Sequence, residues 1–164
     1  YQTRGALAAL VRDHFAILKV GPGLTFALRE ALWALAAIER EWIAPEARAC
    51  LRDTAIARMR AEPKYWQRYY HASGRELDVD LQYSLSDRIR YYWPDPEIER
   101  ARKKLFANLR DNPPPLPLIG QYLPHALHAL RNGRATPDPH SLAMAHVDAV
   151  LDDYHHACHH HEHS

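Results

Sequence analysis

The sequence predicts a mainly α-helical chain with a minor β contribution. Apolar residues recur at every third or fourth position through several long segments, as on the buried face of a helix. Only one compact apolar run, residues 15–20, is short enough for a buried strand and is ended at once by glycine and proline. With 164 residues, 47% hydrophobic and 25% charged, we expect one soluble globular domain or part of one.

The N-terminal segments alternate between helix and strand. Residues 6–14 carry apolar side chains at helical spacing and predict a short helix. Residues 15–20, FAILKV, predict a buried strand that ends at the glycine-proline-glycine turn of residues 21–23. Residues 24–42 return to helical spacing and predict a long amphipathic helix. This order of elements is typical of an α/β protein.

The middle of the chain contains few sequence patterns typical of β-strands. Residues 45–62 predict a helix that starts with a proline and stops before Pro63. Residues 65–70 form a helical aromatic cluster, and residues 71–80 are predicted as a polar loop. Residues 78–83 are the only other stretch that could pair as a strand, and Ser84 or Ser86 can cap a segment through Tyr92.

The C-terminal segments are predicted as helices separated by prolines. Asp95 and Pro96 form a cap and a first helical position, and we expect the following helix to bury Ile98, Ala101, Leu105 and Leu109. Residues 112–117 are proline-rich and predict an extended connector. Residues 118–131 predict a helix bent near a proline, and a last helix begins at about residue 141.

Charge and cysteine content limit the possible functions. The net charge of +1 provides no overall field for nucleic acid or anionic lipid, so we expect neither partner. No apolar run reaches the roughly 18 residues of a membrane span, and there is no signal-type start. Because Cys50 and Cys158 are the only cysteines, we expect a reducing, cytoplasmic location. The start at Tyr1 and a single strand without a partner suggest that part of a larger sheet or barrel precedes the chain.

Several long stretches of the sequence resemble one family. Residues 1–39 read YQTRGALAALVRDHFAILKVGPGLTFALREALWALAAIE, and residues 83–94 read YSLSDRIRYYWP. Four shorter blocks follow the same order and spacing: IAPE (43–46), EPKYW (62–66), QYLP (121–124) and VLDDY (150–154). Together they resemble the GatZ/KbaZ family, the non-catalytic subunits of class II tagatose-bisphosphate aldolase. The resemblance covers nearly all of residues 1–158, although Gly120 replaces an expected serine.

The resemblance implies a fold and a role. Residues 1–158 would be the C-terminal part of a (β/α)₈ TIM barrel, with FAILKVGPG as a late strand, and residues 159–164 a His-rich tail. The metal ligands of such a barrel, and any zinc they hold in the full-length protein, would lie upstream. The role would be accessory, supporting the activity and stability of a catalytic aldolase subunit in galactitol and N-acetylgalactosamine catabolism. The alternatives are a metal-dependent ketose-6-phosphate 4-epimerase, or no independent role. A kinase finds no support, because no GxxxxGK[ST] loop is present.

The turn after the predicted strand is the first candidate for sugar-phosphate binding. Gly21 and Gly23 allow close approach of a ligand to the backbone, and Thr25 lies where a helix N-terminus could hold phosphate. A plain tight turn explains the same glycines. Lys19 could bind phosphate or sugar hydroxyls, form a Schiff base, or simply reach solvent; we favour binding over the Schiff base, because the class II family uses metal chemistry.

The second candidate is the segment that contains Ser86, Arg88 and Arg90. Two guanidinium groups beside a serine hydroxyl can bind a phosphate through paired hydrogen bonds. The alternative is an ion pair between Asp87 and an arginine, packed against the neighbouring aromatic residues. The nearly neutral chain argues against single-stranded nucleic acid as the ligand.

The C-terminal sequence HHACHHHEHS has many metal-donor groups but no fixed geometry. We interpret it as adventitious and assign no metal ligands, no cofactor and no catalytic residues to this chain.

Overall fold

The computed structural model describes residues 3–13 and 21–159, and within them all regular secondary structure is helical. The mainly helical class is therefore confirmed for this part of the chain, whereas the predicted strand of residues 15–20 lies outside the described residues. The α-helices are α1 (Arg4–Arg12), α2 (Gly23–Trp42), α3 (Leu51–Ala61), α4 (Gly74–Tyr83), α5 (Pro96–Asp111), α6 (Leu116–Tyr122), α7 (Pro124–Arg131) and α8 (Pro139–His159). Three 3₁₀ turns connect them: η1 (Pro45–Ala47), η2 (Pro63–Tyr65) and η3 (Arg88–Tyr91).

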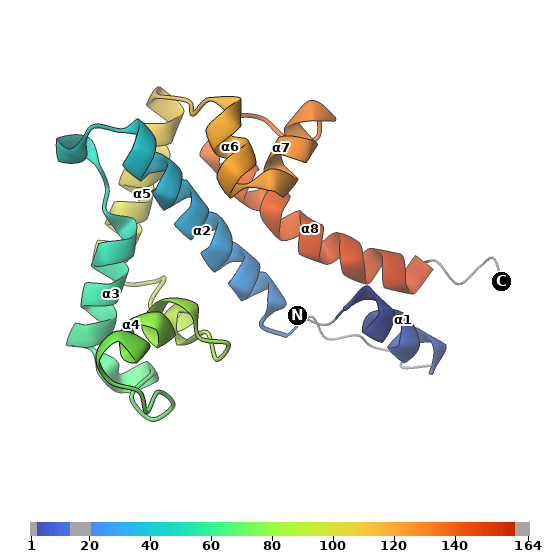
Figure 1. The fold of residues 1–164 in the computed structure, drawn as a ribbon, viewed down its shortest axis with the longest axis horizontal. Helices are drawn as coiled ribbons and strands as arrows, with labels where there is room; N and C mark the ends of the chain where they lie inside the picture. The colour runs from blue at the N-terminus through green and yellow to red at the C-terminus, as the bar shows by residue number, and fades with distance from the viewer. Residues whose placement is uncertain (1–2, 14–20, 160–164) are drawn as a thin grey trace.

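Helix α2 lies at the centre of the molecule (Figure 1). It packs along α8, which also contacts α1 and α7, while α3 and α5 pair with each other near the C-terminal end of α2. Helix α4 and the loops around it form the end of the molecule opposite α6 and α7. The apolar side of α2 supplies much of the shared core, through Ala31, Leu32, Trp33, Leu35 and Ile38.

Helix α5 agrees closely with its prediction. The Asp95 side chain accepts hydrogen bonds from the backbone N–H groups of Glu97 at 2.9 Å and Ile98 at 3.4 Å, so the predicted cap is confirmed. The four residues expected to point inward are all buried: Ile98, Ala101, Leu105 and Leu109.

Two predictions about the middle of the chain are wrong. Helix α4 replaces the predicted strand of residues 78–83 and all but residues 71–73 of the predicted loop, and it starts at Gly74 in the left-handed region (φ +56°). Local polarity suggested a loop, but the helix needs only a narrow contact face, with Leu81 buried and Leu77 packed against the core. The predicted minor β contribution therefore has no support among the described residues.

Two further helices were predicted too long. The helix of residues 45–62 is broken into η1 and α3, because Cys50 adopts a left-handed conformation (φ +53°). The buried Glu39 carboxylate stabilises this break by accepting a 2.9 Å hydrogen bond from the backbone N–H of Ala49. Residues 118–131 form two helices, α6 and α7, which are separated at Leu123. In the described part of the chain, no helix has the length and hydrophobicity required to span a membrane.

Candidate functional site

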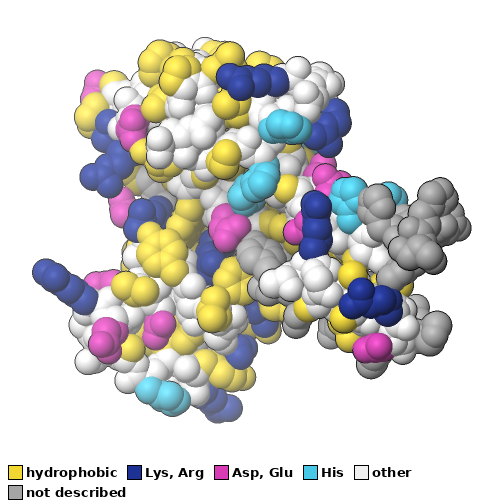
Figure 2. Space-filling view, turned by 45° about the vertical axis from the view of Figure 1, so that its right-hand side comes forward, with side chains coloured by type: hydrophobic (Ala, Val, Ile, Leu, Met, Phe, Trp, Pro, Cys, Tyr) yellow, Lys and Arg dark blue, Asp and Glu magenta, His cyan; other side chains and the backbone are white. Residues whose placement is uncertain are grey.

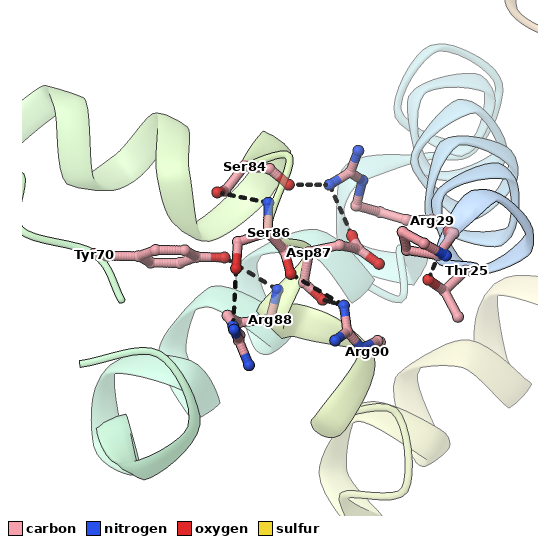
Figure 3. Close-up of polar contacts among 9 residues, drawn as sticks. Thr25, Arg29, Tyr70, Ser84, Ser86, Asp87, Arg88 and Arg90 are labelled. Carbon is pink, nitrogen blue, oxygen red and sulfur yellow. Dashed lines mark hydrogen bonds and ion pairs between the residues drawn. The ribbon is translucent and has the colours of Figure 1, made fainter. Parts of the chain in front are cut away.

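A buried ion pair fixes the loop that follows α4. Arg29, on α2, donates a 2.8 Å hydrogen bond to the Asp87 carboxylate, and the two side chains are 6% and 0% exposed. The same guanidinium lies 3.4 Å from the carbonyl oxygen of Ser84 and 4.5 Å from the centre of the Phe26 ring. The loop is thus held against α2 by a charge interaction shielded from water (Figure 3).

Asp87 occupies an unusual backbone conformation. Its φ of 46° and ψ of 49° lie in the left-handed region, which aspartate tolerates better than most residues. Ser84 Oγ accepts a 3.2 Å hydrogen bond from the backbone N–H of Ser86, which lies before η3. Among the described residues no side chain caps η3 itself, so neither predicted serine is its cap, and the segment is one short 3₁₀ turn. The other carboxylate oxygen of Asp87, Oδ2, is buried and has no hydrogen-bond partner within residues 3–13 and 21–159.

Arg88 points away from the buried ion pair (Figure 3). Its backbone N–H donates to the hydroxyl of Tyr70 at 3.0 Å, and its Nε donates to Ser86 Oγ at 2.9 Å. The guanidinium lies over the Tyr69 ring, 3.3 Å from its centre. Burial raises the pKa of Tyr70, so this hydroxyl stays protonated at neutral pH.

The Arg90 guanidinium is largely used within the loop. One terminal nitrogen donates to the carbonyl oxygens of Ser86 at 3.0 Å and Asp87 at 3.2 Å, and the other donates to the Tyr91 hydroxyl at 3.0 Å. These contacts hold the turn together and leave Arg90 less able than Arg88 to bind a ligand.

The turn before α2 forms the other half of the predicted site. Gly21 has φ +61°, which explains the need for glycine there, and Gly23 is the first residue of α2. Thr25 Oγ1 donates to the carbonyl oxygen of Pro22 at 2.9 Å. Lys19, the remaining member of the set, lies outside the described residues.

The predicted phosphate-binding residues fall into two groups rather than one pocket. Thr25 lies one helical turn before Arg29, and this arginine connects α2 to the loop that carries Ser86 and Arg88. Between the two groups is a groove of about 680 Å³, lined by Pro22, Phe26, Arg29, Glu30, Trp33, Tyr83 and Leu85. Its walls are mostly apolar, so the groove suits a hydrophobic surface better than a phosphate.

A second hollow lies where α7 and α8 meet α1. It has a volume of about 690 Å³, and its lining includes Arg4, His125, His128 and His146. His146 Nε2 lies 3.1 Å from a carboxylate oxygen of Glu30, while its Nδ1 is buried without a hydrogen-bond partner. Figure 2 shows histidine and acidic side chains close together on this face.

The residues described by the structure contain no group of three His, Cys, Asp or Glu side chains placed to bind a metal. These residues therefore do not fit the zinc that the family resemblance implies for a full-length protein, and residues 160–164 of the tail lie outside the described residues.

Sequence reasoning missed Arg29 and Tyr70. An ion pair between Asp87 and an arginine was foreseen as an alternative, but the sequence did not identify the partner as Arg29, which is 58 residues away. The available signal was a single arginine within the largely apolar stretch from Phe26 to Trp33, because a charge in such a position needs a buried partner. Tyr70 carried no comparable signal.

The described chain is thus a helical domain with a charged and aromatic loop anchored on its central helix. A family model described as "D-tagatose-1,6-bisphosphate aldolase subunit GatZ/KbaZ-like" matches residues 1–159. The chain belongs to this family, which confirms the resemblance found in the sequence.

Individual relatives agree with the family match. The D-tagatose-1,6-bisphosphate aldolase subunit GatZ of Klebsiella pneumoniae is 51% identical over 158 residues, and the GatZ of Salmonella paratyphi B is 50% identical over 158 residues. Each match covers 96% of this chain and 37% of the relative. A crystal structure described as a probable tagatose 6 phosphate kinase from Sinorhizobium meliloti 1021 is similar with a TM-score of 0.90 at 49% identity, covering 96% of this chain and 41% of that one. The chain therefore spans little more than a third of the length of its curated relatives.

Proposed function

We propose that the protein is an accessory, non-catalytic subunit that supports the activity and stability of a class II tagatose-1,6-bisphosphate aldolase. The observation that carries this proposal is the match of 96% of the chain, at about half identity, to proteins described as subunits of that aldolase. An aldolase of this kind would cleave tagatose 1,6-bisphosphate into dihydroxyacetone phosphate and glyceraldehyde 3-phosphate.

The apolar groove beside α2 supports a role in assembly. Leu85 stands at its edge with 85% of its surface exposed, next to Tyr83, which is 43% exposed. Exposed apolar side chains around a hollow are typical of surfaces that another protein covers. Because the Arg29–Asp87 pair fixes the loop, Leu85 is presented from a rigid position.

The proposal can be tested by reconstitution with a catalytic aldolase subunit. The chain is added to the catalytic subunit, and tagatose 1,6-bisphosphate cleavage is followed through dihydroxyacetone phosphate, before and after heating. We expect the chain to raise the activity or to lengthen its half-life, and we expect Leu85→Ser to weaken this effect. Leu116→Ser is the matched control, because Leu116 is 53% exposed at the start of α6, away from the groove.

The full-length Klebsiella pneumoniae relative serves as the positive control. If it stimulates the aldolase while the present chain leaves both rate and half-life unchanged, the accessory role of this chain is refuted. Interconversion of fructose 6-phosphate and tagatose 6-phosphate by the chain without the partner would instead favour the ketose-6-phosphate 4-epimerase alternative.

Three further parts of the proposal follow from the family. We propose that the chain forms the C-terminal part of a (β/α)₈ barrel protein, with its final barrel units, and that any divalent metal such as zinc is held by upstream residues of that barrel. We retain Lys19, Gly21, Gly23 and Thr25, with Ser86, Arg88 and Arg90, as proposed sugar-phosphate contacts. A cytoplasmic location is proposed because Cys50 and Cys158 are both free and exposed, as suits a reducing compartment.

A further inference from the structure

A hollow of about 450 Å³ lies on the outer side of the Ser84–Tyr92 loop, where the loop meets the turn after α3. We call it the tyrosine–cation pocket, and it is lined by Lys64, Tyr65, Gln67, Arg68, Tyr69, Arg88 and Tyr91. Its volume is within the range of small-molecule sites. It lies apart from the apolar groove, since the two share no lining residue.

The charges around the tyrosine–cation pocket have one sign. Lys64, Arg68 and Arg88 contribute three positive charges, and none of the lining residues is acidic. One nearby negative charge partly neutralises these positive charges: the Glu62 carboxylate lies 3.3 Å from Lys64 Nζ. Arg68 is exposed and has no hydrogen-bond or ion-pair partner among the residues that the structure describes. The pocket therefore has an excess positive charge in a chain that is nearly neutral overall.

Arg88 is held in place before any ligand binds. Its Nε bond to Ser86 and its stacking on Tyr69 fix the plane of the guanidinium. Within the described structure, neither of its terminal nitrogens has a hydrogen-bond partner. A fixed guanidinium with two free terminal N–H₂ groups matches the paired oxygens of a phosphate, with little entropy lost on binding.

The tyrosines provide a surface beside this charge. The rings of Tyr65 and Tyr91 stack with their centres 5.4 Å apart, and Tyr65, Tyr69 and Tyr91 are 39%, 53% and 43% exposed. Aromatic faces can pack against the C–H groups of a sugar, while the hydroxyls and Gln67 can form hydrogen bonds with its hydroxyl groups.

We propose that the tyrosine–cation pocket binds a small phosphate monoester, with the phosphate between Arg88 and Arg68 and its sugar against the tyrosines. Phosphate binding is inferred from three observations: the excess positive charge, the fixed guanidinium of Arg88, and the lack of a partner for Arg68 among the described residues. Only the choice of a sugar rests on the proposed function, and binding here requires no aldolase subunit.

The test is calorimetric titration of the chain with four probes: inorganic phosphate, fructose 6-phosphate, adenosine monophosphate and unphosphorylated fructose. We expect fructose 6-phosphate to bind more tightly than phosphate, and fructose not to bind. Arg68→Gln should weaken fructose 6-phosphate binding by roughly tenfold, the order expected for one charge-assisted hydrogen bond. Arg88→Lys should weaken it at least as much, because lysine keeps the charge and loses the planar fork.

Arg131→Gln is the matched control, because Arg131 is an exposed, partner-free arginine of the described chain on α7, at the opposite end of the molecule. The Arg131→Gln variant should bind the four probes with the same affinity as the unchanged protein. Since Arg68 has no hydrogen-bond or ion-pair partner among the described residues, Arg68→Gln should test binding without disturbing the fold, and equal thermal midpoints would verify this.

Four outcomes would overturn the inference. The first is absence of phosphate and fructose 6-phosphate binding, and the second is affinity that Arg68→Gln and Arg88→Lys leave unchanged. Tighter binding of adenosine monophosphate than of fructose 6-phosphate would place the nucleobase, rather than the sugar, against the tyrosines and overturn that part of the inference. Finally, loss of aldolase stimulation in Arg68→Gln without any phosphate binding would make the pocket a contact for an acidic partner surface. If the proposed accessory role is wrong, only the aldolase assay will show it, and the calorimetric titration will be unaffected. The accessory role and phosphate binding can therefore be refuted independently.

Discussion

Replacing Arg29 with methionine should destabilise the protein strongly. Methionine can fill much of the apolar space of the arginine stem, but it leaves the buried Asp87 carboxylate without the one ion-pair partner that the described residues give it. Removing one member of a buried ion pair typically costs about 3–5 kcal/mol. The cost here should be near the upper end, because Asp87 Oδ2 already lacks a hydrogen-bond partner. This is a large share of the roughly 5–15 kcal/mol that stabilises an ordinary domain.

A second substitution separates the lost ion pair from lost packing. In the double variant Arg29→Met/Asp87→Asn, the stranded charge is removed, and asparagine tolerates the left-handed conformation at position 87 as well as aspartate does. We therefore expect the double variant to be more stable than Arg29→Met alone. The coupling energy between the two positions should be about 1–3 kcal/mol.

The assay is urea unfolding followed by circular dichroism, with the free energy of unfolding obtained for all four members of the cycle. The control cycle uses Arg60→Met and Asp78→Asn, because this ion pair joins two side chains that are 48% and 49% exposed. Exposed pairs contribute about 0–1 kcal/mol, so the control cycle should show small losses. The reasoning is refuted if Arg29→Met costs no more than Arg60→Met, or if the losses at positions 29 and 87 simply add.

Three other predictions test the fold. Burial by itself raises the pKa of Asp95, but the hydrogen bonds from Arg58 and from the backbone N–H groups of Glu97 and Ile98, with the charge of Arg58, together lower this pKa below its ordinary value. The ionised form of Asp95 therefore stabilises the fold at neutral pH, and this contribution disappears as pH falls through the lowered pKa. Urea midpoints of the unchanged protein and Asp95→Asn should therefore differ at pH 7 and converge only as the pH falls below the lowered pKa of Asp95; a gap constant with pH would contradict this. Gly133→Ala should cost about 1–2 kcal/mol because Gly133 has φ +67°, whereas Gly5→Ala, inside α1 with open space around the added carbon, should be neutral or stabilising in the same assay. Leu105→Ala should lower the free energy of unfolding by about 2–5 kcal/mol, since Leu105 is fully buried, and a loss below 1 kcal/mol would argue against the packing of α5.

The helices with a clear apolar face could be predicted from the sequence. Helix α5 buries its four expected residues, and helix α2 buries Ala31, Leu32, Leu35 and Ile38 of its expected apolar face. Trp42, at the end of that face, is instead 46% exposed. The Asp95 cap is a local feature that four residues define. Helix α4 was missed because its stability comes from tertiary contacts of Leu77 and Leu81, while most of its residues are polar. The break at Cys50 was missed for a similar reason, since the Glu39 carboxylate that stabilises it lies on another helix.

The candidate site was predictable in its residue types but not in its pairing. The sequence placed Ser86, Arg88 and Arg90 together, and an ion pair of Asp87 with an arginine was foreseen as an alternative. Which arginine pairs with Asp87 depends on how α2 packs against the loop, and this tertiary arrangement cannot be predicted from local sequence. The tyrosine–cation pocket likewise joins Arg68 and Arg88, whose separation in sequence concealed their proximity.

The left-handed backbone conformation at Asp87 couples a buried ion pair to the orientation of a side chain on the other side of the loop. One peptide unit separates a carboxylate that faces α2 from a guanidinium that faces solvent. A substitution that allowed the backbone at position 87 to leave the left-handed region would reorient the Asp87 carboxylate and the Arg88 guanidinium together. The buried ion pair and the orientation of Arg88 therefore depend on the same backbone conformation. Natural variation at position 29, deep inside the molecule, should therefore alter the orientation of an outward-facing arginine that it never touches.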